Sequence, residues 1–111
     1  MSSDVTRWQV GDRVMSLFFP DWQEGRHHPE RTAAVTGDTI DGCACEYAVL
    51  AENAVTPMPK NLSFAEAATL PCAGLTAWHA LMVRGKMQAG DTLLVQGTGG
   101  VSVIALQLAK A

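Results

Sequence analysis

Three glycines near the end of the chain carry the chemistry that its sequence predicts most clearly. Residues 92–96 are apolar enough for a short strand, Gly97, Gly99 and Gly100 follow, and residues 101–108 have helical spacing. The first amides of a helix lack partners inside it and carry a partial positive charge, so a phosphate placed there gains hydrogen bonds and a favourable dipole. The pattern therefore predicts a turn that can hold the pyrophosphate of a nucleotide.

Each glycine has an expected role in this turn. Gly97 supplies the positive φ of a tight turn, and Gly99 and Gly100 remove β-carbons that would collide with a pyrophosphate. Ser102 stands where the usual motif has a third glycine, and serine is small enough for close helix packing. A Walker-type phosphate loop is excluded, because no Gly-Lys-Ser or Gly-Lys-Thr follows. An ordinary strand-to-helix turn remains the alternative.

Composition sets the class of protein in which this turn must work. The 111 residues are 48% hydrophobic and 17% charged, which is a globular balance. A net charge of -3 argues against a nucleic-acid partner, because such proteins carry a basic face. The sequence has no apolar signal core and no uninterrupted apolar span. We therefore expect no membrane partner and a cytoplasmic location. Three cysteines fit reduced thiols better than a disulfide framework.

The first half of the chain predicts a β-rich region. Short β-branched or aromatic runs predict strands at residues 13–19, 46–50 and 54–56, separated by Gly, Pro and Asp. The last of them should end at Pro57, which cannot donate to a ladder. Residues 21–41 form a polar stretch long enough to be an excursion from the sheet.

The middle of the chain predicts two helices. Ser63 and Glu66 have the spacing of a capping box, and the helix they start should run to about Leu70, where Pro71 forces a break. A second helix is predicted from apolar residues three and four apart and from the glycines at its exit, namely Leu75, Trp78, Met82, Gly85 and Gly90.

The final helix is expected to need cover on two sides. One face carries Val101, Ile104, Ala105 and Leu108, while Val103 and Leu106 make the opposite face apolar too. A single parallel strand beside one such helix cannot satisfy its backbone or bury its faces. We therefore expect self-association, with strand exchange as one route.

Six motifs, taken in order and spacing, resemble the medium-chain dehydrogenase/reductase superfamily, in particular its zinc-type alcohol dehydrogenase-like and quinone oxidoreductase-like NAD(P)-dependent branch. They are Gly-Asp-Arg-Val at 11–14, Asp-Gly at 41–42, Glu-Tyr at 46–47, residues 57–62, Glu-Ala-Ala-Thr-Leu-Pro-Cys-Ala-Gly-Leu-Thr-Ala-Trp at 66–78, and Val-Gln-Gly-Thr-Gly-Gly-Val-Ser at 95–102. The resemblance covers nearly all residues from Gly11 to Ala111.

The resemblance implies an α/β fold assembled from parts of two domains. Residues 1–62 would be the latter part of a GroES-like β-barrel, residues 63–90 a helical connection, and residues 91–111 the first βα unit of a truncated Rossmann domain. It implies an oxidoreductase that passes hydride between a nicotinamide dinucleotide and a small carbonyl, alcohol or enone substrate. Because family members are several times longer, the chain resembles an internal fragment that is incomplete as a catalyst.

The resemblance also implies cofactor-binding positions. Thr76 matches a position beside the nicotinamide, and the pyrophosphate turn is matched by Gly97, Thr98, Gly99, Gly100, Val101 and Ser102. The cofactor can be NAD or NADP, because the ribose-recognising residue falls outside the 111 residues. Cys72 aligns with a cysteine that binds catalytic zinc in true zinc alcohol dehydrogenases. Since catalytic zinc needs about three protein ligands and the other matching positions are missing, no zinc is expected.

Other reactive groups have simpler expected roles. Cys43 and Cys45 are expected to be unremarkable thiols rather than a redox pair or a metal site. His27 and His28 beside Glu30 are expected to be solvated loop residues rather than a chelate. Packing roles are expected for His79 on the second helix and for Trp8 and Trp22 in the β-rich region.

Two other kinds of function remain as alternatives. The first is a truncated non-catalytic module that acts through oligomerisation or interaction at an exposed sheet edge. The second is a thiol-based redox sensor that uses Cys43, Cys45 or Cys72.

Overall fold

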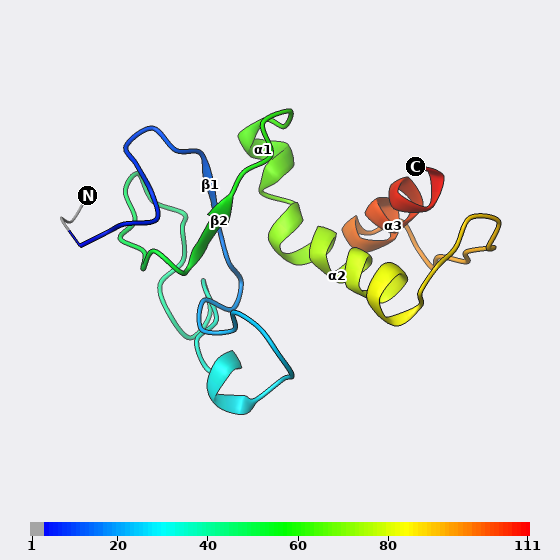
Figure 1. The fold of residues 1–111 in the computed structure, drawn as a ribbon, viewed down its shortest axis with the longest axis horizontal. Helices are drawn as coiled ribbons and strands as arrows, with labels where there is room; N and C mark the ends of the chain where they lie inside the picture. The colour runs from blue at the N-terminus through cyan, green and yellow to red at the C-terminus, as the bar shows by residue number, and fades with distance from the viewer. Residues whose placement is uncertain (1–3) are drawn as a thin grey trace. The chain divides into compact units, whose positions relative to one another are not determined.

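The computed structural model describes residues 4–111, which Figure 1 shows as a ribbon. The chain divides into two compact units, Met1–Leu62 and Ser63–Ala111. The boundary lies at the end of residues 1–62, whose assignment to a barrel stays a prediction. The further division of the second unit at residue 90 stays a prediction.

The first unit is built on a short antiparallel pair of strands. Strand β1 (Val14–Ser16) pairs with β2 (Val55–Pro57), and Met15 lies opposite Thr56. Two further backbone hydrogen bonds, Leu17 N to Ala54 O and Met58 N to Arg13 O, both 2.9 Å, extend the pairing. The strand predicted at 13–19 is therefore confirmed in shortened form, and the strand predicted at 54–56 is confirmed with its bounds moved by one residue. Pro57 is the last residue of β2, and a proline, which has no amide hydrogen, is tolerated at this end of the strand.

The strand predicted at residues 46–50 is wrong. These residues lie outside every described strand, and Tyr47 and Val49 are 92% and 103% exposed. A β-strand is defined by hydrogen bonds to a neighbouring strand, and in the part of the chain that the structure describes the sheet has two members, β1 and β2. Favourable composition without a partner leaves the segment irregular.

The polar stretch at residues 21–41 is an excursion, as predicted. It contains the 3-10 helix η1 (Pro29–Thr32) and a small turn closed by hydrogen bonds of Thr39 Oγ1 with Ala33 O and Val35 N, both 2.8 Å. Thr36 Oγ1 donates to Leu17 O at 3.0 Å, which ties the excursion back to the end of β1.

The second unit begins with a capped helix, α1 (Phe64–Ala67). Ser63 Oγ accepts from the amide of Glu66 at 3.3 Å, and the Glu66 carboxylate accepts from the amide and hydroxyl of Ser63 at 2.8 and 2.7 Å. The capping box predicted from the sequence is thus confirmed. The helix ends three residues earlier than predicted.

The second predicted helix is a run of π and α turns. The π-helix η2 (Leu70–Gly74) has Pro71 in its first turn, α2 (Leu75–Trp78) follows, and the π-helix η3 (His79–Arg84) has Gly85 as its C-cap. Proline lacks an amide hydrogen and is tolerated in a first turn. Pro71 therefore marks a new helical start after α1 rather than a gap, and the predicted exit at Gly85 is confirmed.

The buried side of this run differs from the predicted stripe. Gly74 and Ala77 are buried, whereas Leu75 and Trp78 are 60% and 50% exposed. Small residues let a neighbouring helix approach closely, and α3 (Gly100–Lys110) packs against both η2 and α2. Figure 1 shows α3, in orange to red, lying alongside α2. The predicted final helix is confirmed.

The strand predicted at residues 92–96 is wrong in this structure. These residues precede α3 without forming a ladder with any described residue. The reason is the same as for residues 46–50, since no second strand lies beside them. Among the described residues, no helix has the length and apolar character needed to cross a membrane.

Candidate functional site

The candidate site is the turn between residues 96 and 102, at the start of α3. Gly97 has a φ of +78°, the positive value that the sequence predicts for it. A β-carbon built on Gly97 or on Gly99 would meet no other group within 4 Å. The outer side of the turn is therefore open, and a ligand can approach its backbone.

The amide end of α3 is free to bind an anion. The helix starts after Gly99, which has extended backbone angles (φ -72°, ψ 170°), and no side chain caps it within residues 4–111. Val103 N donates to Gly99 O at 3.0 Å and so makes the first helical hydrogen bond. By helix geometry, the amides of Gly100, Val101 and Ser102 have no intrahelical partner. They are the donors that a pyrophosphate would use.

Side-chain charge plays no part in the turn. Residues 92–109 contain no Asp, Glu, Lys, Arg or His. The helix dipole gives this position a partial positive charge, and residues 92–109 bring no carboxylate that would repel a phosphate. The turn can thus bind an anion but provides no acid, base or nucleophile.

Gly100 is placed by its packing. A β-carbon on Gly100 would lie 3.7 Å from the β-carbon of Ala73 in η2, which is an ordinary contact distance. The sequence predicts that Gly100 makes space for the ligand. The packing gives a second explanation, in which the glycine allows α3 to pack closely on η2. Thr98 and Val101 are exposed at the turn.

Ser102 does more than fill a small space. Its hydroxyl donates to Gln96 O at 2.9 Å and so joins the residue before the turn to the first turn of α3. Sequence reasoning found only the small size of Ser102. The hydrogen bond was missed because the motif describes glycine positions and carries no signal for a hydroxyl.

Thr76 lies in α2, on the helical run that packs against α3. Its hydroxyl donates to Cys72 O, one turn earlier, at 2.7 Å. A hydroxyl has one hydrogen, so Thr76 Oγ1 keeps only its acceptor capacity for a ligand. The side chain is exposed and can be reached.

The described residues do not assemble a metal site. No group of three or more His, Cys, Asp and Glu side chains among residues 4–111 is close enough to hold an ion. Cys72 is an exposed free thiol, as are Cys43 and Cys45. A single thiolate does not fit the three-ligand arrangement of catalytic zinc.

The other reactive candidates lie away from the turn in sequence and in role. His28 Nδ1 lies 3.8 Å from Glu30 Oε2 with both side chains mostly exposed, and the exposed His27 contacts Thr32 Oγ1 at 3.3 Å, as expected of solvated loop residues. The packing role predicted for His79 is wrong, because this residue is exposed at the start of η3. Trp8 and Trp22 are partly buried, as predicted.

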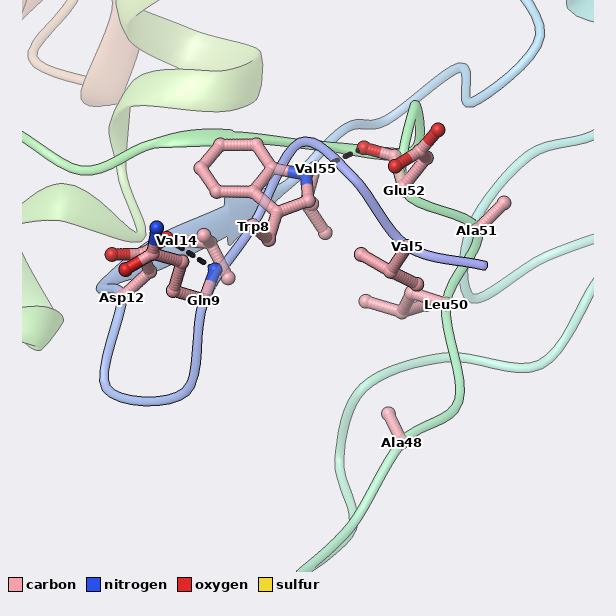
Figure 2. Close-up of a pocket in the computed structure, with 10 residues that line it drawn as sticks. All are labelled: Val5, Trp8, Gln9, Asp12, Val14, Ala48, Leu50, Ala51, Glu52 and Val55. Atoms are coloured by element: carbon pink, nitrogen blue, oxygen red, sulfur yellow. Dashed lines mark hydrogen bonds between the residues drawn. The ribbon is translucent and has the colours of Figure 1, made fainter. Parts of the chain in front are cut away.

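Sequence reasoning missed a hollow of about 260 Å³ in the first unit (Figure 2). Two segments far apart in the sequence, residues 5–14 and 48–55, supply its lining, so no local motif predicts it. Its walls are Val5, Trp8, Gln9, Asp12, Val14, Ala48, Leu50, Ala51, Glu52 and Val55.

Polar groups that line this hollow make hydrogen bonds within the protein. Asp12 Oδ2 accepts from Gln9 N at 2.8 Å, Glu52 Oε2 accepts from the amides of residues 6 and 7 at 3.2 Å, and Trp8 Nε1 donates to Glu52 O at 2.8 Å. Figure 2 shows two of these bonds, those of Trp8 and Gln9. The hollow is mainly apolar and its hydrogen bonds hold the loop that precedes β1.

Several known proteins are similar to this chain in sequence, and a solved structure is similar to it in fold. A zinc-type alcohol dehydrogenase-like protein of Schizosaccharomyces pombe is 45% identical over 113 aligned positions, which cover 100% of this chain and 33% of that protein. A 2-methylene-furan-3-one reductase of Solanum lycopersicum is 39% identical over 102 positions, 92% of this chain and 26% of the reductase. No protein-family model matches the chain.

A solved structure agrees with these relatives. A crystal structure described as an alcohol dehydrogenase, from Sinorhizobium meliloti 1021, superposes with a TM-score of 0.89 at 51% identity, over 96% of this chain and 32% of that one. The chain thus spans about a quarter to a third of the length of these three proteins. The resemblance read from the motifs is confirmed: the chain is homologous to a stretch of the zinc-type alcohol dehydrogenase-like proteins of the medium-chain dehydrogenase/reductase superfamily.

Proposed function

We propose that the chain is part of an NAD(P)-dependent oxidoreductase, in which the turn at residues 97–102 holds the pyrophosphate of the cofactor. One observation carries this proposal: an uncapped helix start follows a glycine with positive φ, and the space above Gly97 and Gly99 is open. Backbone amides in this arrangement match the acceptor oxygens of a pyrophosphate. The relatives support the same reaction class, since their names are those of alcohol dehydrogenase-like proteins and a reductase.

The same proposal assigns the two units to two domains. Residues 1–62 would be the latter part of a GroES-like barrel, and residues 63–90 the helical connection. Residues 91–111 would become the first βα unit of a Rossmann sheet once other strands lie beside residues 92–96. The existing antiparallel pair and the confirmed α3 fit this assignment.

The chain's own contribution to such a reaction is binding and orientation. When bound, the nicotinamide supplies or accepts the hydride, and the substrate is a small carbonyl, alcohol or enone. The amides of residues 100–102 hold the pyrophosphate. Thr76 would lie beside the nicotinamide, where its oxygen can only accept a hydrogen bond because its hydrogen is committed to Cys72 O. Zinc has no assigned part, since Cys72 stands without further ligands among the described residues.

The 111 residues alone are proposed to bind the cofactor weakly and to transfer no hydride. The turn carries no acid or base, and the chain holds no residue matched to the adenosine ribose. NADH and NADPH should therefore bind with the same affinity.

Fluorescence titration with NADH and with NADPH tests this proposal. Both should give saturable binding in about the millimolar range, and Gly99→Val should abolish it by filling the open space above the turn. Gln107→Val is the matched control, because residue 107 is exposed on the same helix but outside the turn. Equal binding by wild type and Gly99→Val would contradict the proposed site.

A second function, an oligomerisation or interaction module, is favoured by a different observation. Val103 and Leu106, which share one face of α3 by helical spacing, are 43% and 51% exposed, and Leu94 before the helix is 84% exposed. Apolar side chains gathered on one element are typical of a surface that another chain covers. We propose that the chain associates with itself through this face of α3, and sedimentation of the purified chain tests the association.

A further inference from the structure

We propose that Ser102 is a positioning residue whose hydroxyl clamps the turn at residues 97–102 in its binding conformation. The inference rests on the proposed function, because the conformation in question is the one that receives the pyrophosphate. Its basis is the 2.9 Å hydrogen bond from Ser102 Oγ to Gln96 O, which spans the turn from end to end.

The turn needs such a clamp because little else restrains it. Three of its first four residues are glycines, which have the largest conformational freedom of any residue. No group lies within 4 Å of the positions where β-carbons would stand on Gly97 and Gly99. Among residues 4–111, the hydrogen bonds across or beside the turn are that of Ser102 and the first helical bond, Val103 N to Gly99 O. Of these, only the Ser102 bond reaches the residue before the turn.

The clamp also holds the amides in place for an anion. Ser102 lies in the first turn of α3, and Gln96 immediately precedes Gly97. Fixing the distance between them fixes the path of the backbone between Gly97 and Val101. Free amides that already point to one region bind an anion without paying the ordering entropy at the moment of binding. A glycine at position 102 would leave the Gln96 carbonyl without this donor.

The clamp and the packing explanation predict opposite rankings of the Ser102 variants in NADH affinity. If Ser102 matters only because it is small, Gly and Ala should serve as well as Ser, and Thr should be worse. If the hydroxyl matters, Thr should keep the function, and Gly and Ala should lose it. Ser102 is partly exposed, so the additional methyl of threonine has room.

Two measurements on the full chain decide between these orders. The first, without ligand, is ¹⁵N relaxation of the amides of residues 97–100 in wild type, Ser102→Thr, Ser102→Ala and Ser102→Gly. Wild type and the Thr variant should show an ordered turn, and the other two a mobile one. The second is NADH affinity by amide-shift titration, which should stay within about twofold for Thr and fall about fivefold for Ala and Gly.

The outcomes separate the clamp from the proposed function. An ordered turn in Ser102→Ala and Ser102→Gly, or tightest binding by Ser102→Gly, would overturn the clamp. Failure of NADH to bind even the wild type would refute cofactor binding by this chain, while the relaxation data would still decide the role of Ser102. Circular dichroism of each variant identifies any that fails to fold. The Thr variant, which retains the hydroxyl, then provides the rescue.

Discussion

At the residue scale, Gly97 and Gly90 both have a positive φ, each in a different turn. Comparing substitutions at the two positions therefore separates the cost of backbone strain from an effect on cofactor binding. Their φ values are +78° and +94°, and a β-carbon on either would meet no group within 4 Å. A side chain at either position therefore costs backbone strain and produces no clash. Only Gly97 belongs to the proposed pyrophosphate turn.

Gly97→Ala and Gly90→Ala are expected to lower the free energy of unfolding by a similar amount, about 1 kcal/mol each. Chemical denaturation measures this loss. NADH binding should weaken in Gly97→Ala and stay unchanged in Gly90→Ala, because only the first alters the path of the binding amides. Equal NADH affinity in the two variants would contradict the role of Gly97.

At the scale of elements, the capping box of α1 gives the chain a defined pH dependence. The pKa of Glu66 lies below its ordinary value, first because its carboxylate accepts the backbone amide of Ser63 and second because it accepts the Ser63 hydroxyl. The cap is therefore complete above the ordinary pKa of a glutamate, about 4.3. It is lost as the pH falls through the lower pKa of the folded state.

An NMR titration of the Glu66 carboxyl should show this lowered pKa, and Ser63→Ala should raise it toward the ordinary value. The helix signal should fall together with the titration in wild type. Glu66→Gln is the control, because it keeps an acceptor oxygen and does not titrate. An unshifted pKa in the wild type would show that the capping box is not formed in solution.

Packing of α3 on α2 depends on small residues. Ala77 is 1% exposed, and α2 and α3 are in direct contact. Ala77→Leu should lower the free energy of unfolding by about 1–3 kcal/mol through overpacking, as measured by denaturation. Ala80→Leu, exposed on the same helical run, should change it by less than about 0.5 kcal/mol. Equal effects would mean that the two helices do not pack in this way.

Features that depend on nearby residues could be predicted from the sequence, whereas features that depend on residues far along the chain could not. The Ser63 cap, the exit at Gly85 and the positive φ of Gly97 depend on nearby residues, and all three were predicted correctly. Strands at residues 46–50 and 92–96 depend on partners that the described chain does not place beside them, so both predictions were wrong. The candidate site shows the same limit, because the glycine roles follow from the motif but the Ser102 bond does not.

At the scale of the whole molecule, the chain buries little of its apolar surface. The buried apolar residues are mostly small, including Ala54, Ala67, Ala77 and Ala105, and no large side chain among the described residues is less than 2% exposed. Proteins of this size are marginally stable even with a well-filled core. Association that covers the exposed apolar side chains would bury apolar surface that a single copy leaves in contact with water.

Sedimentation should therefore show self-association of the purified chain. Leu106→Glu, which places a charge on the exposed apolar side of α3, should shift the equilibrium strongly toward monomer. Gln107→Glu adds the same charge on the same helix at a polar exposed position and should have little effect. A compact monomer in the wild type at all accessible concentrations would refute self-association.

Mapping the amide shifts of the whole chain during titration with NADH, and separately with inorganic pyrophosphate, tests most directly whether the start of α3 receives the cofactor. We predict that both ligands cause their largest changes at residues 97–102, and that Gly99→Val removes those changes. Changes concentrated elsewhere, or no change in the turn at concentrations well above the millimolar range, would contradict the assignment.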